Sequence, residues 1–249
     1  MSTTFRPDLF TAETIKYDLH SHLLPGVDDG VRNPEDGLQL IEGLIKLGYA
    51  GAVTTPHIYP EVFDNTEEGL RCRFKEFSDL VKQYFPDFSL DLGAEYYLDE
   101  HLISKIINNP FDLLMIGKQR RWILVEFPTL NPPLNVHDLF LVCQRQHWQP
   151  IIAHVERYDY IQKEKTPVLL KEWIRQGALL QMDLGSVVGQ YGSRAAETAD
   201  ALLKQQGYHF IGTDLHHPRQ WERYSLPAWN LLKKNKAYFF DEKKHHLLL

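Results

Sequence analysis

The chain has 249 residues, of which 43% are hydrophobic and 24% are charged, and its formal net charge is -6. This composition is typical of a soluble globular protein with a substantial core. It argues against nucleic acid as the main partner, because binding a phosphate backbone needs clustered Lys and Arg. We expect one domain over residues 1–249, with its core at about 15–242.

The N-terminal segment has neither the basic start nor the apolar centre of a signal peptide. No apolar run in the sequence is long enough to span a membrane. We therefore expect a cytoplasmic protein without membrane insertion. The sequence leaves its oligomeric state open.

Short apolar, β-rich runs recur along the chain, and each carries a residue that can bind a metal. The runs are IKYDLHSH, AGAVTTPH, SLDLGAEYY, RWILVEFP, QPIIAHVER, ALLQMDLGS and HFIGTDLHH. Each is interpreted as one strand, and between most of them lie segments with helical periodicity. Those segments are 34–49, 66–85, 135–148, 166–177 and 193–207. The alternation predicts parallel β-α units, and about seven such units favour a closed barrel over an open sheet.

Two of the helical segments show a clear apolar face. In the first, the apolar residues are Leu38, Ile41, Leu44, Ile45 and Leu47, and Gly48 is a stop signal. In the second, they are Leu70, Phe74, Phe77, Leu80 and Val81. We expect both helices to pack these faces against the sheet.

The metal-capable residues share one position, at or just beyond a predicted strand end. They are His20, His22, His57, Glu95, Glu126, His154, Asp214 and His216. In β/α barrels the carboxyl ends of the strands converge on one rim, where active sites form. Imidazole and carboxylate together suit Zn, Mn or Fe, and this set exceeds one tetrahedral site. The pattern predicts a site for two or three metal ions with bridging carboxylates.

Each piece also has a plainer interpretation. A lone His at a strand end is more often a hydrogen-bonded structural residue than a ligand. The pair Asp28-Asp29 followed by Gly is a common turn signature that caps a following helix. Arg157 could form a surface ion pair with Glu156 or Asp159. The joint placement at strand ends is what favours the metal site.

The two cysteines, Cys72 and Cys143, do not indicate a disulfide framework. Cysteine-based tyrosine phosphatases need an Arg six positions after the catalytic Cys, where it binds the phosphate. This chain has Ser78 six positions after Cys72, and Gln149 six positions after Cys143. That mechanism is excluded. Both cysteines are interpreted as helix-packing residues.

Six motifs resemble those of a known family and occur in the same order. They are DLHSHLLPGVDDG, TTPH, GAEYY, VEFP, IIAHVERYD and GTDLHH, from about Asp18 to about His217. They are similar to motifs of the PHP (polymerase and histidinol phosphatase) superfamily. The closest resemblance is to its bacterial tyrosine-protein phosphatase branch, the CpsB/YwqE type of capsule loci. It implies a distorted (β/α)7 TIM-like barrel with a trinuclear metal centre, often loaded with manganese, with Fe, Zn and Mg as alternatives.

The resemblance also implies roles for individual residues. The implied metal ligands are His20, His22, Asp29, His57, Glu95, Glu126, His154, Asp214 and His216. Glu95 would bridge two metals, and Asp29 rather than Asp28 would be the ligand from the turn. We expect Arg157, Asp214 and His216 to act in catalysis.

Substrate binding is assigned to three residues, Arg157, Arg219 and Tyr158. Arg157 can bind phosphate through two parallel hydrogen bonds. Five aromatic residues near the rim could stack on a phenyl ring: Tyr96, Tyr97, Phe127, Tyr158 and Tyr191.

The expected function is a metal-dependent hydrolysis of phosphotyrosine in a bacterial tyrosine kinase of capsular or exopolysaccharide synthesis. A metal cluster suits phosphoester hydrolysis because it lowers the pKa of water and clamps phosphate oxygens. The alternatives are another phosphoesterase of the superfamily, such as a histidinol-phosphate phosphatase or a nuclease, and a non-catalytic metal-binding regulator. A metal-dependent amidohydrolase is disfavoured, because it usually needs a strand-end Lys and no predicted strand ends in one.

Overall fold

Parallel strands form the inner layer of the molecule. The computed structural model describes residues 17–117, 121–163, 168–205 and 207–234, so the expected core limits at about 15 and 242 lie outside them. The strands are β1 (Tyr17–Asp18), β2 (Gly51–Thr54), β3 (His57–Ile58), β4 (Ser89–Leu92), β5 (Glu95–Tyr97), β6 (Trp122–Glu126), β7 (Gln149–Ile152), β8 (Leu179–Asp183) and β9 (Phe210–Gly212). They form two sheets, ordered β1-β2-β4 and β3-β5-β6-β7-β8-β9. Within each sheet, neighbouring strands pair in parallel.

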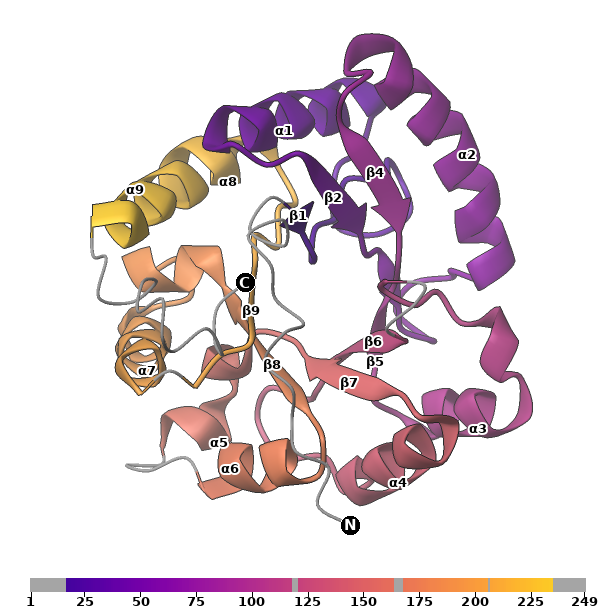
Figure 1. The fold of residues 1–249 in the computed structure, drawn as a ribbon, viewed down its shortest axis with the longest axis vertical. Helices are drawn as coiled ribbons and strands as arrows, with labels where there is room; N and C mark the ends of the chain where they lie inside the picture. The colour runs from indigo at the N-terminus through magenta and orange to yellow at the C-terminus, as the bar shows by residue number, and fades with distance from the viewer. Residues whose placement is uncertain (1–16, 118–120, 164–167, 206, 235–249) are drawn as a thin grey trace.

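Helices lie on the outside of this curled sheet (Figure 1). The α-helices are α1 (Pro34–Leu47), α2 (Glu67–Tyr84), α3 (Glu100–Asn108), α4 (Val136–Gln146), α5 (Asp159–Gln162), α6 (Val168–Arg175), α7 (Ser193–Lys204), α8 (Pro218–Gln220) and α9 (Leu226–Lys234). Short 3-10 or π segments are η3 (Pro110–Asp112), η4 (Val155–Arg157), η5 (Leu184–Val188) and η6 (Trp221–Ser225). The result is a mixed α/β fold built on a curled parallel sheet.

The five predicted helical segments correspond to α1, α2, α4, α6 and α7, which confirms the helical periodicity. In α1, the side chain of Asn33 accepts a hydrogen bond from the Asp36 backbone at 2.9 Å, and Pro34 fills the first turn. Gly48 ends the helix with φ 96°, a left-handed conformation that glycine adopts without a steric penalty. One expectation is wrong: Ile45 is exposed, and Leu40 occupies the buried face instead.

Two predicted strands are each broken in two, so the interpretation of one strand per run is wrong there. The run ending at His57 forms β2 and β3, separated by Thr55 and Pro56. Proline has no N–H to donate to a ladder, which interrupts regular pairing. The run containing Glu95 similarly breaks between β4 and β5. His57 and Glu95 therefore begin short strands instead of ending long ones.

The segment that follows β1 and the segment that follows β9 are joined by backbone hydrogen bonds. The Asp214 N–H donates to His20 at 2.9 Å, and the His22 N–H donates to Leu215 at 2.9 Å. Asp18 reinforces this junction, because its carboxylate accepts from the Thr213 N–H at 3.0 Å. The segments that carry His20, His22 and Asp214 are thus held side by side.

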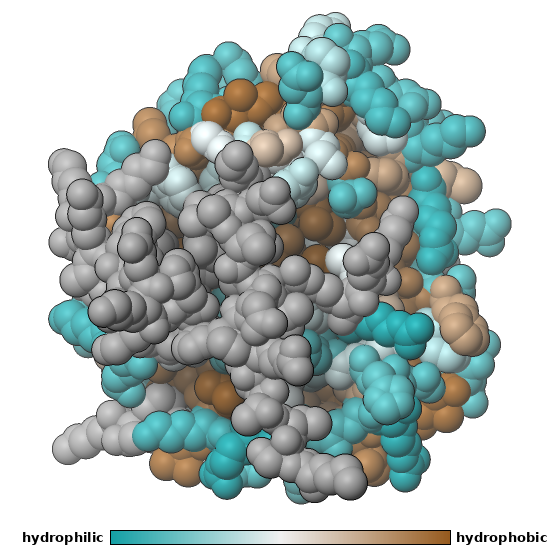
Figure 2. Space-filling view, viewed as in Figure 1, coloured by the Kyte–Doolittle hydropathy of each residue, from teal (hydrophilic) through white to brown (hydrophobic). Residues whose placement is uncertain are grey.

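A hydrophobic core fills the space between sheet and helices. Its largest fully buried side chains include Tyr96, Tyr158, Tyr208, Phe127 and Phe140. The outer face along α2 is mostly hydrophilic, at the upper right of Figure 2. Cys143 is buried in α4 as expected, but Cys72 on α2 is exposed, so its interpretation as a packing residue is wrong. Among the described helices, none has both the length and the apolar character needed to cross a membrane.

Candidate metal centre

Histidines and carboxylates gather at the carboxyl-end rim of the curled sheet in three overlapping groups. The deep subsite comprises His20, His22, Glu95 and Asp214. The shallow subsite comprises His22, Asp29, His57 and His216. The third subsite comprises His57, Glu95 and Glu126. In each group the candidate donor atoms lie within 4.8 Å of one another, so each could hold a metal ion.

The deep subsite has the dimensions of a metal coordination shell. Glu95 Oε2 lies 3.1 Å from His20 Nε2 and 3.3 Å from His22 Nε2. Asp214 Oδ1 lies 3.3 Å from His20 Nε2 and 3.4 Å from His22 Nε2, and the two imidazole nitrogens are 3.3 Å apart. Tetrahedral ligands about 2.0–2.1 Å from a zinc-sized ion are about 3.3–3.4 Å from each other. The residues present therefore fit a divalent cation between them.

Strand register explains how residues far apart in sequence converge. His57 on β3 pairs with Glu95 on β5, and Tyr97 pairs with Glu126 on β6. Glu95 is central, because its Oε2 atom also lies 3.3 Å from His57 Nδ1. Its other oxygen, Oε1, lies 3.1 Å from His154 Nε2. One carboxylate thus contacts both the deep and the third subsites, as a bridging ligand would.

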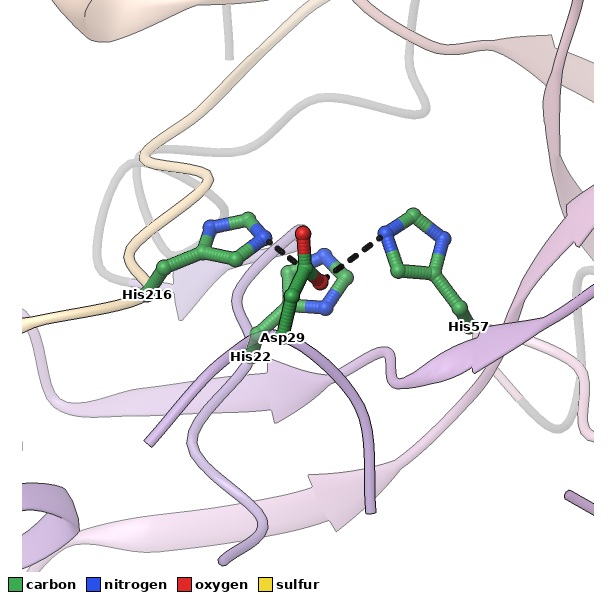
Figure 3. A group of neighbouring side chains, drawn as sticks. All are labelled: His22, Asp29, His57 and His216. Carbon is green, nitrogen blue, oxygen red and sulfur yellow. Dashed lines mark ion pairs between the residues drawn. The ribbon is translucent and has the colours of Figure 1, made fainter. Parts of the chain in front are cut away.

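The turn after the first strand separates the roles of the two adjacent aspartates. Gly26, with φ 69°, reverses the chain, and its N–H donates to Val31 at 2.8 Å. Asp29 projects between two imidazoles, 3.6 Å from His57 Nε2 and 3.5 Å from His216 Nε2 (Figure 3). The Asp28 side chain is instead fully buried, against His22 Nδ1. The turn therefore brings Asp29, and not Asp28, to the shallow subsite.

Buried hydrogen-bond partners fix the orientation of the imidazoles. Asp28 Oδ2 lies 2.7 Å from His22 Nδ1 and accepts from the His57 N–H at 3.0 Å. Gln181 Oε1 lies 3.0 Å from His20 Nδ1. A proton held on Nδ1 leaves the Nε2 lone pair directed at the centre, which is the usual arrangement of a metal-bound histidine.

Two candidate ligands, His154 and Asp214, have left-handed backbones, with φ 30° and 48°. Non-glycine residues rarely adopt this conformation, and it costs on the order of 1–3 kcal/mol unless surrounding contacts impose it. The Asp214 N–H bond to His20 supplies one such contact. This kind of strain is concentrated at functional sites.

Crowded charges shift the pKa values of the cluster in opposite directions. Burial, together with the charge of Glu95, raises the pKa of Glu126 to about 8. Burial disfavours the charged form of His20 and so lowers its pKa, but the charges of Glu95 and Asp214 outweigh burial and raise the pKa to about 9. Burial and Arg157 lower the pKa of His154 to about 4. The carboxylates thus need cations close by, and a metal ion could supply that charge.

Arg157 extends from η4 over the deep subsite. Its Nη1 atom donates to Asp214 Oδ2 at 2.7 Å, and its guanidinium carbon lies 4.2 Å from the centroid of the Tyr191 ring. The plainer interpretation, a surface pair with Glu156 or Asp159, does not describe this geometry. Glu156 is fully buried and accepts from Ser186 at 2.6 Å. Arg157 is therefore placed at the rim, beside the candidate ligands.

The assignment of Tyr158 to substrate binding is wrong. Tyr158 is fully buried, its ring is stacked between Phe127 and Tyr160, and its hydroxyl accepts from the Phe127 N–H at 3.0 Å. Tyr96 and Phe127 are also buried in the core. A substrate ring cannot reach any of these three without unpacking the core.

The remaining predicted substrate residues differ in exposure. Arg219 is exposed on α8, just beyond His216. Tyr97 is partly exposed and stacks on Tyr59, with ring centroids 3.9 Å apart and planes 7° apart. Tyr191 is also partly exposed, and its hydroxyl lies 3.3 Å from Asp214 Oδ2.

Sequence reasoning missed Gln181 at the base of the site, and it gave Asp183, the metal-capable residue of the run ALLQMDLGS, no role. Both are on β8 and both are buried. Gln181 contacts His20 and accepts from the His154 N–H at 3.1 Å. Asp183 Oδ2 lies 3.8 Å from Arg157 Nη1. Their spacing of two within the buried run LLQMD was the available signal, because alternate strand residues point to the same side.

A curled parallel α/β sheet with imidazole and carboxylate donors at its carboxyl-end rim defines a candidate metal-dependent hydrolase. The chain matches the family described as "Capsular polysaccharide synthesis, CpsB/CapC" over residues 16–236, and it belongs to that family.

Relatives and a solved structure agree with this membership. CapC of Staphylococcus aureus is 28% identical over 199 residues, covering 80% of this chain and 76% of that protein. The tyrosine-protein phosphatase YwqE of Bacillus subtilis is 26% identical over 218 residues, covering 87% of this chain and 84% of YwqE. The crystal structures of YwqE and of CpsB from Streptococcus pneumoniae are described as those of metal-dependent tyrosine phosphatases. The matched chain superposes with a TM-score of 0.78 at 24% identity, covering 91% of this chain and 88% of that one.

Proposed function

We propose that this protein is a metal-dependent protein-tyrosine phosphatase. The observation that carries the proposal is the deep subsite, four buried donor atoms at coordination distances with an arginine beside them. Membership of the CpsB/CapC family and similarity to the tyrosine phosphatase YwqE support the choice of reaction.

The proposed cofactor is two or three divalent metal ions, with manganese the first choice. The three overlapping donor groups support this number, and the mixture of imidazole and carboxylate supports Mn, Fe or Zn over a thiolate-selective metal. When bound, such ions neutralise phosphate charge and lower the pKa of water. The proposed ligands are His20, His22, Asp29, His57, Glu95, Glu126, His154, Asp214 and His216.

The proposed fold is a distorted (β/α)7 barrel of the PHP type. Counting the broken pairs β2/β3 and β4/β5 as single strands reduces the nine strands of the described residues to seven. Backbone hydrogen bonds across both breaks support this reading: the Gly93 N–H donates to Thr54 at 2.9 Å, and the Glu95 N–H donates to Pro56 at 3.1 Å. The hydrogen bonds between the segments of His20 and Asp214 would close the ring.

The chain's own residues would bind and orient the substrate. Arg157 can donate to the non-bridging phosphate oxygens, and its planar fork suits that geometry better than a lysine would. Asp214 would use Oδ1 toward the deep subsite and Oδ2 toward Arg157, which couples the two. The partly exposed Tyr97, and Arg219 beyond His216, would lie along the path of a bound peptide.

The proposed substrate is a phosphotyrosine in a bacterial tyrosine kinase of capsular or exopolysaccharide synthesis. The family description supports the pathway, and the named activity of YwqE supports the phosphorylated residue. A tyrosyl oxygen, with a pKa near 10 in the free side chain, is a better leaving group than an alkoxide. A cytoplasmic location and the absence of a nucleic-acid partner stay predictions.

Purified protein loaded with Mn²⁺ should hydrolyse a phosphotyrosine peptide faster than histidinol phosphate or single-stranded DNA. The matched control is the Glu95→Gln variant, which keeps the shape of the side chain and loses its charge. Turnover of histidinol phosphate without hydrolysis of the peptide would overturn the proposed substrate. Metal binding without hydrolysis of any phosphoester would favour a regulatory protein.

A further inference from the structure

The guanidinium of Arg157 is surrounded by carboxylates at the edge of the site. Its Nη1 atom is 2.7 Å from Asp214 Oδ2 and 3.8 Å from Asp183 Oδ2. Its other neighbour is the ring of Tyr191, 4.2 Å away. One cation therefore lies between two acids, and only one of these acids belongs to a candidate metal subsite.

Asp183 is the acid that belongs to none of the three candidate metal subsites of the described residues. It ends β8, is fully buried, and pairs in register with Gly212 on β9, two residues before Asp214. Its Oδ1 atom accepts from the Gly185 N–H at 2.6 Å and caps η5. Its Oδ2 atom is also buried and accepts no hydrogen bond from the described residues. A buried carboxylate oxygen without a partner is costly, so its orientation toward Arg157 requires an explanation.

Asp214 alone is poorly suited to hold Arg157. Its Oδ1 atom contacts both His20 and His22 in the deep subsite, so a cation there would draw on the charge of the same carboxylate. The contact between Asp214 and Arg157 is then weakened, while Asp183, which belongs to no candidate metal subsite, still faces the guanidinium. An arginine that binds phosphate also needs a fixed position, because a guanidinium that is already ordered loses less entropy when it binds the phosphate.

We propose that Asp183 is a positioning residue that holds Arg157 toward the substrate phosphate. The proposal rests on the proposed phosphatase function for its readout, and it adds a residue that the expected site lacked. Tyr191 assists from the opposite side, because its ring lies against the guanidinium and its hydroxyl lies near Asp214.

The test compares Asp183→Asn with Arg157→Ala and with the double variant, all loaded with Mn²⁺. Asn keeps the Oδ1 cap of η5 and removes only the charge. The inhibition constant of inorganic phosphate and the KM for the substrate should rise about fivefold to tenfold in Asp183→Asn, in the range of coupling between contacting residues. Metal content should be unchanged, and kcat should change less than KM. In the Arg157→Ala background, the same substitution should have no further effect on phosphate binding.

Two matched variants keep the test decisive. Asp159→Asn removes a nearby acid that pairs with Lys163 instead of Arg157, and it should leave phosphate binding unchanged. If Asp183→Asn does not fold, Asp183→Ser offers another short acceptor for the Gly185 N–H.

An equal loss in the wild-type and Arg157→Ala backgrounds would overturn the proposal and assign Asp183 only to capping η5. Phosphate binding unaffected by Asp183→Asn would also overturn it. Phosphate affinity is measured by calorimetry as well, so the proposal is tested even if phosphotyrosine is not the substrate.

Discussion

The deep and shallow subsites share His22, but they differ in exposure and support. In the deep subsite, Glu95 and Asp214 are 1% and 4% exposed, and Gln181 holds His20 from behind. In the shallow subsite, Asp29 is 60% exposed. A buried, oriented donor set gains more from binding a cation, because water competes less and the ligands are already in place. We therefore expect the deep subsite to retain its metal and the shallow subsite to exchange it readily.

The largest effect should follow loss of the carboxylate that the deep and third subsites share. Glu95→Gln should lower metal stoichiometry and reduce kcat by about 10³-fold or more. We expect the same of His22→Ala, because the deep and shallow subsites share His22. Bound metals contribute several kcal/mol of charge stabilisation in the transition state, and about 1.4 kcal/mol corresponds to each tenfold change in rate. Elemental analysis alongside the peptide assay checks both parts. Full metal content in Glu95→Gln would contradict the bridging role.

A smaller loss should follow Asp29→Asn, which changes only the shallow subsite. We expect about one metal fewer per chain, retained metal in the deep subsite, and about 10²-fold lower activity. Asp28→Asn is the matched neighbour: it disturbs the support of His22 and should weaken metal affinity about 10- to 100-fold without removing a ligand. Metal titration of both variants distinguishes them. If Asp28→Asn alone lost a metal at saturation, the two aspartates would have to exchange roles.

Arg157→Ala should leave both subsites loaded and affect the substrate instead. Charge-assisted hydrogen bonds contribute about 1.5–3 kcal/mol, which corresponds to roughly a 10- to 100-fold rise in KM. Steady-state kinetics and elemental analysis of the same preparation measure the two properties. Unchanged kinetics would refute the role of Arg157 in phosphate binding.

The smallest effect concerns protons released on metal binding. In the metal-free protein, Glu126 and His20 have pKa values of about 8 and about 9, so both hold a proton at pH 7. Metal ligands must be deprotonated, so binding should release protons at pH 7, and affinity should rise as the pH increases toward 9. Calorimetry in buffers of different ionisation enthalpy counts these protons. Affinity that falls over this pH range would contradict the prediction.

Much of the fold and of the donor set could be predicted from the sequence, because both depend on local patterns. Helical periodicity located α1 and α2, and parallel β-α units place strand ends on one rim. The break between β2 and β3 has a signal in the sequence, Pro56, which the interpretation of one strand per run did not use. The break between β4 and β5 lies at Gly93 and Ala94, and it depends on how the neighbouring segments pair in three dimensions.

The roles of several side chains near the rim depend on burial and on side-chain direction, which the sequence does not reveal. Tyr158 and Tyr191 both looked like rim aromatics, yet one is a core residue and the other contacts Arg157. Asp183 was visible at a strand end, but its role depends on the direction of the Arg157 side chain. The roles of Asp28 and Asp29 came from a family resemblance, and the geometry of the turn supplies a physical reason for them.

We propose that the rim binds divalent metals and that these metals enable phosphotyrosine hydrolysis. The most direct test titrates metal-free protein with Mn²⁺ while following metal bound per chain and turnover of a phosphotyrosine peptide. We predict that turnover is absent without metal, appears as the deep subsite fills, and reaches its maximum at two or three ions per chain. Equal turnover by metal-free and metal-loaded protein, or maximal turnover without any bound metal, would show that the hydrolysis does not depend on metal.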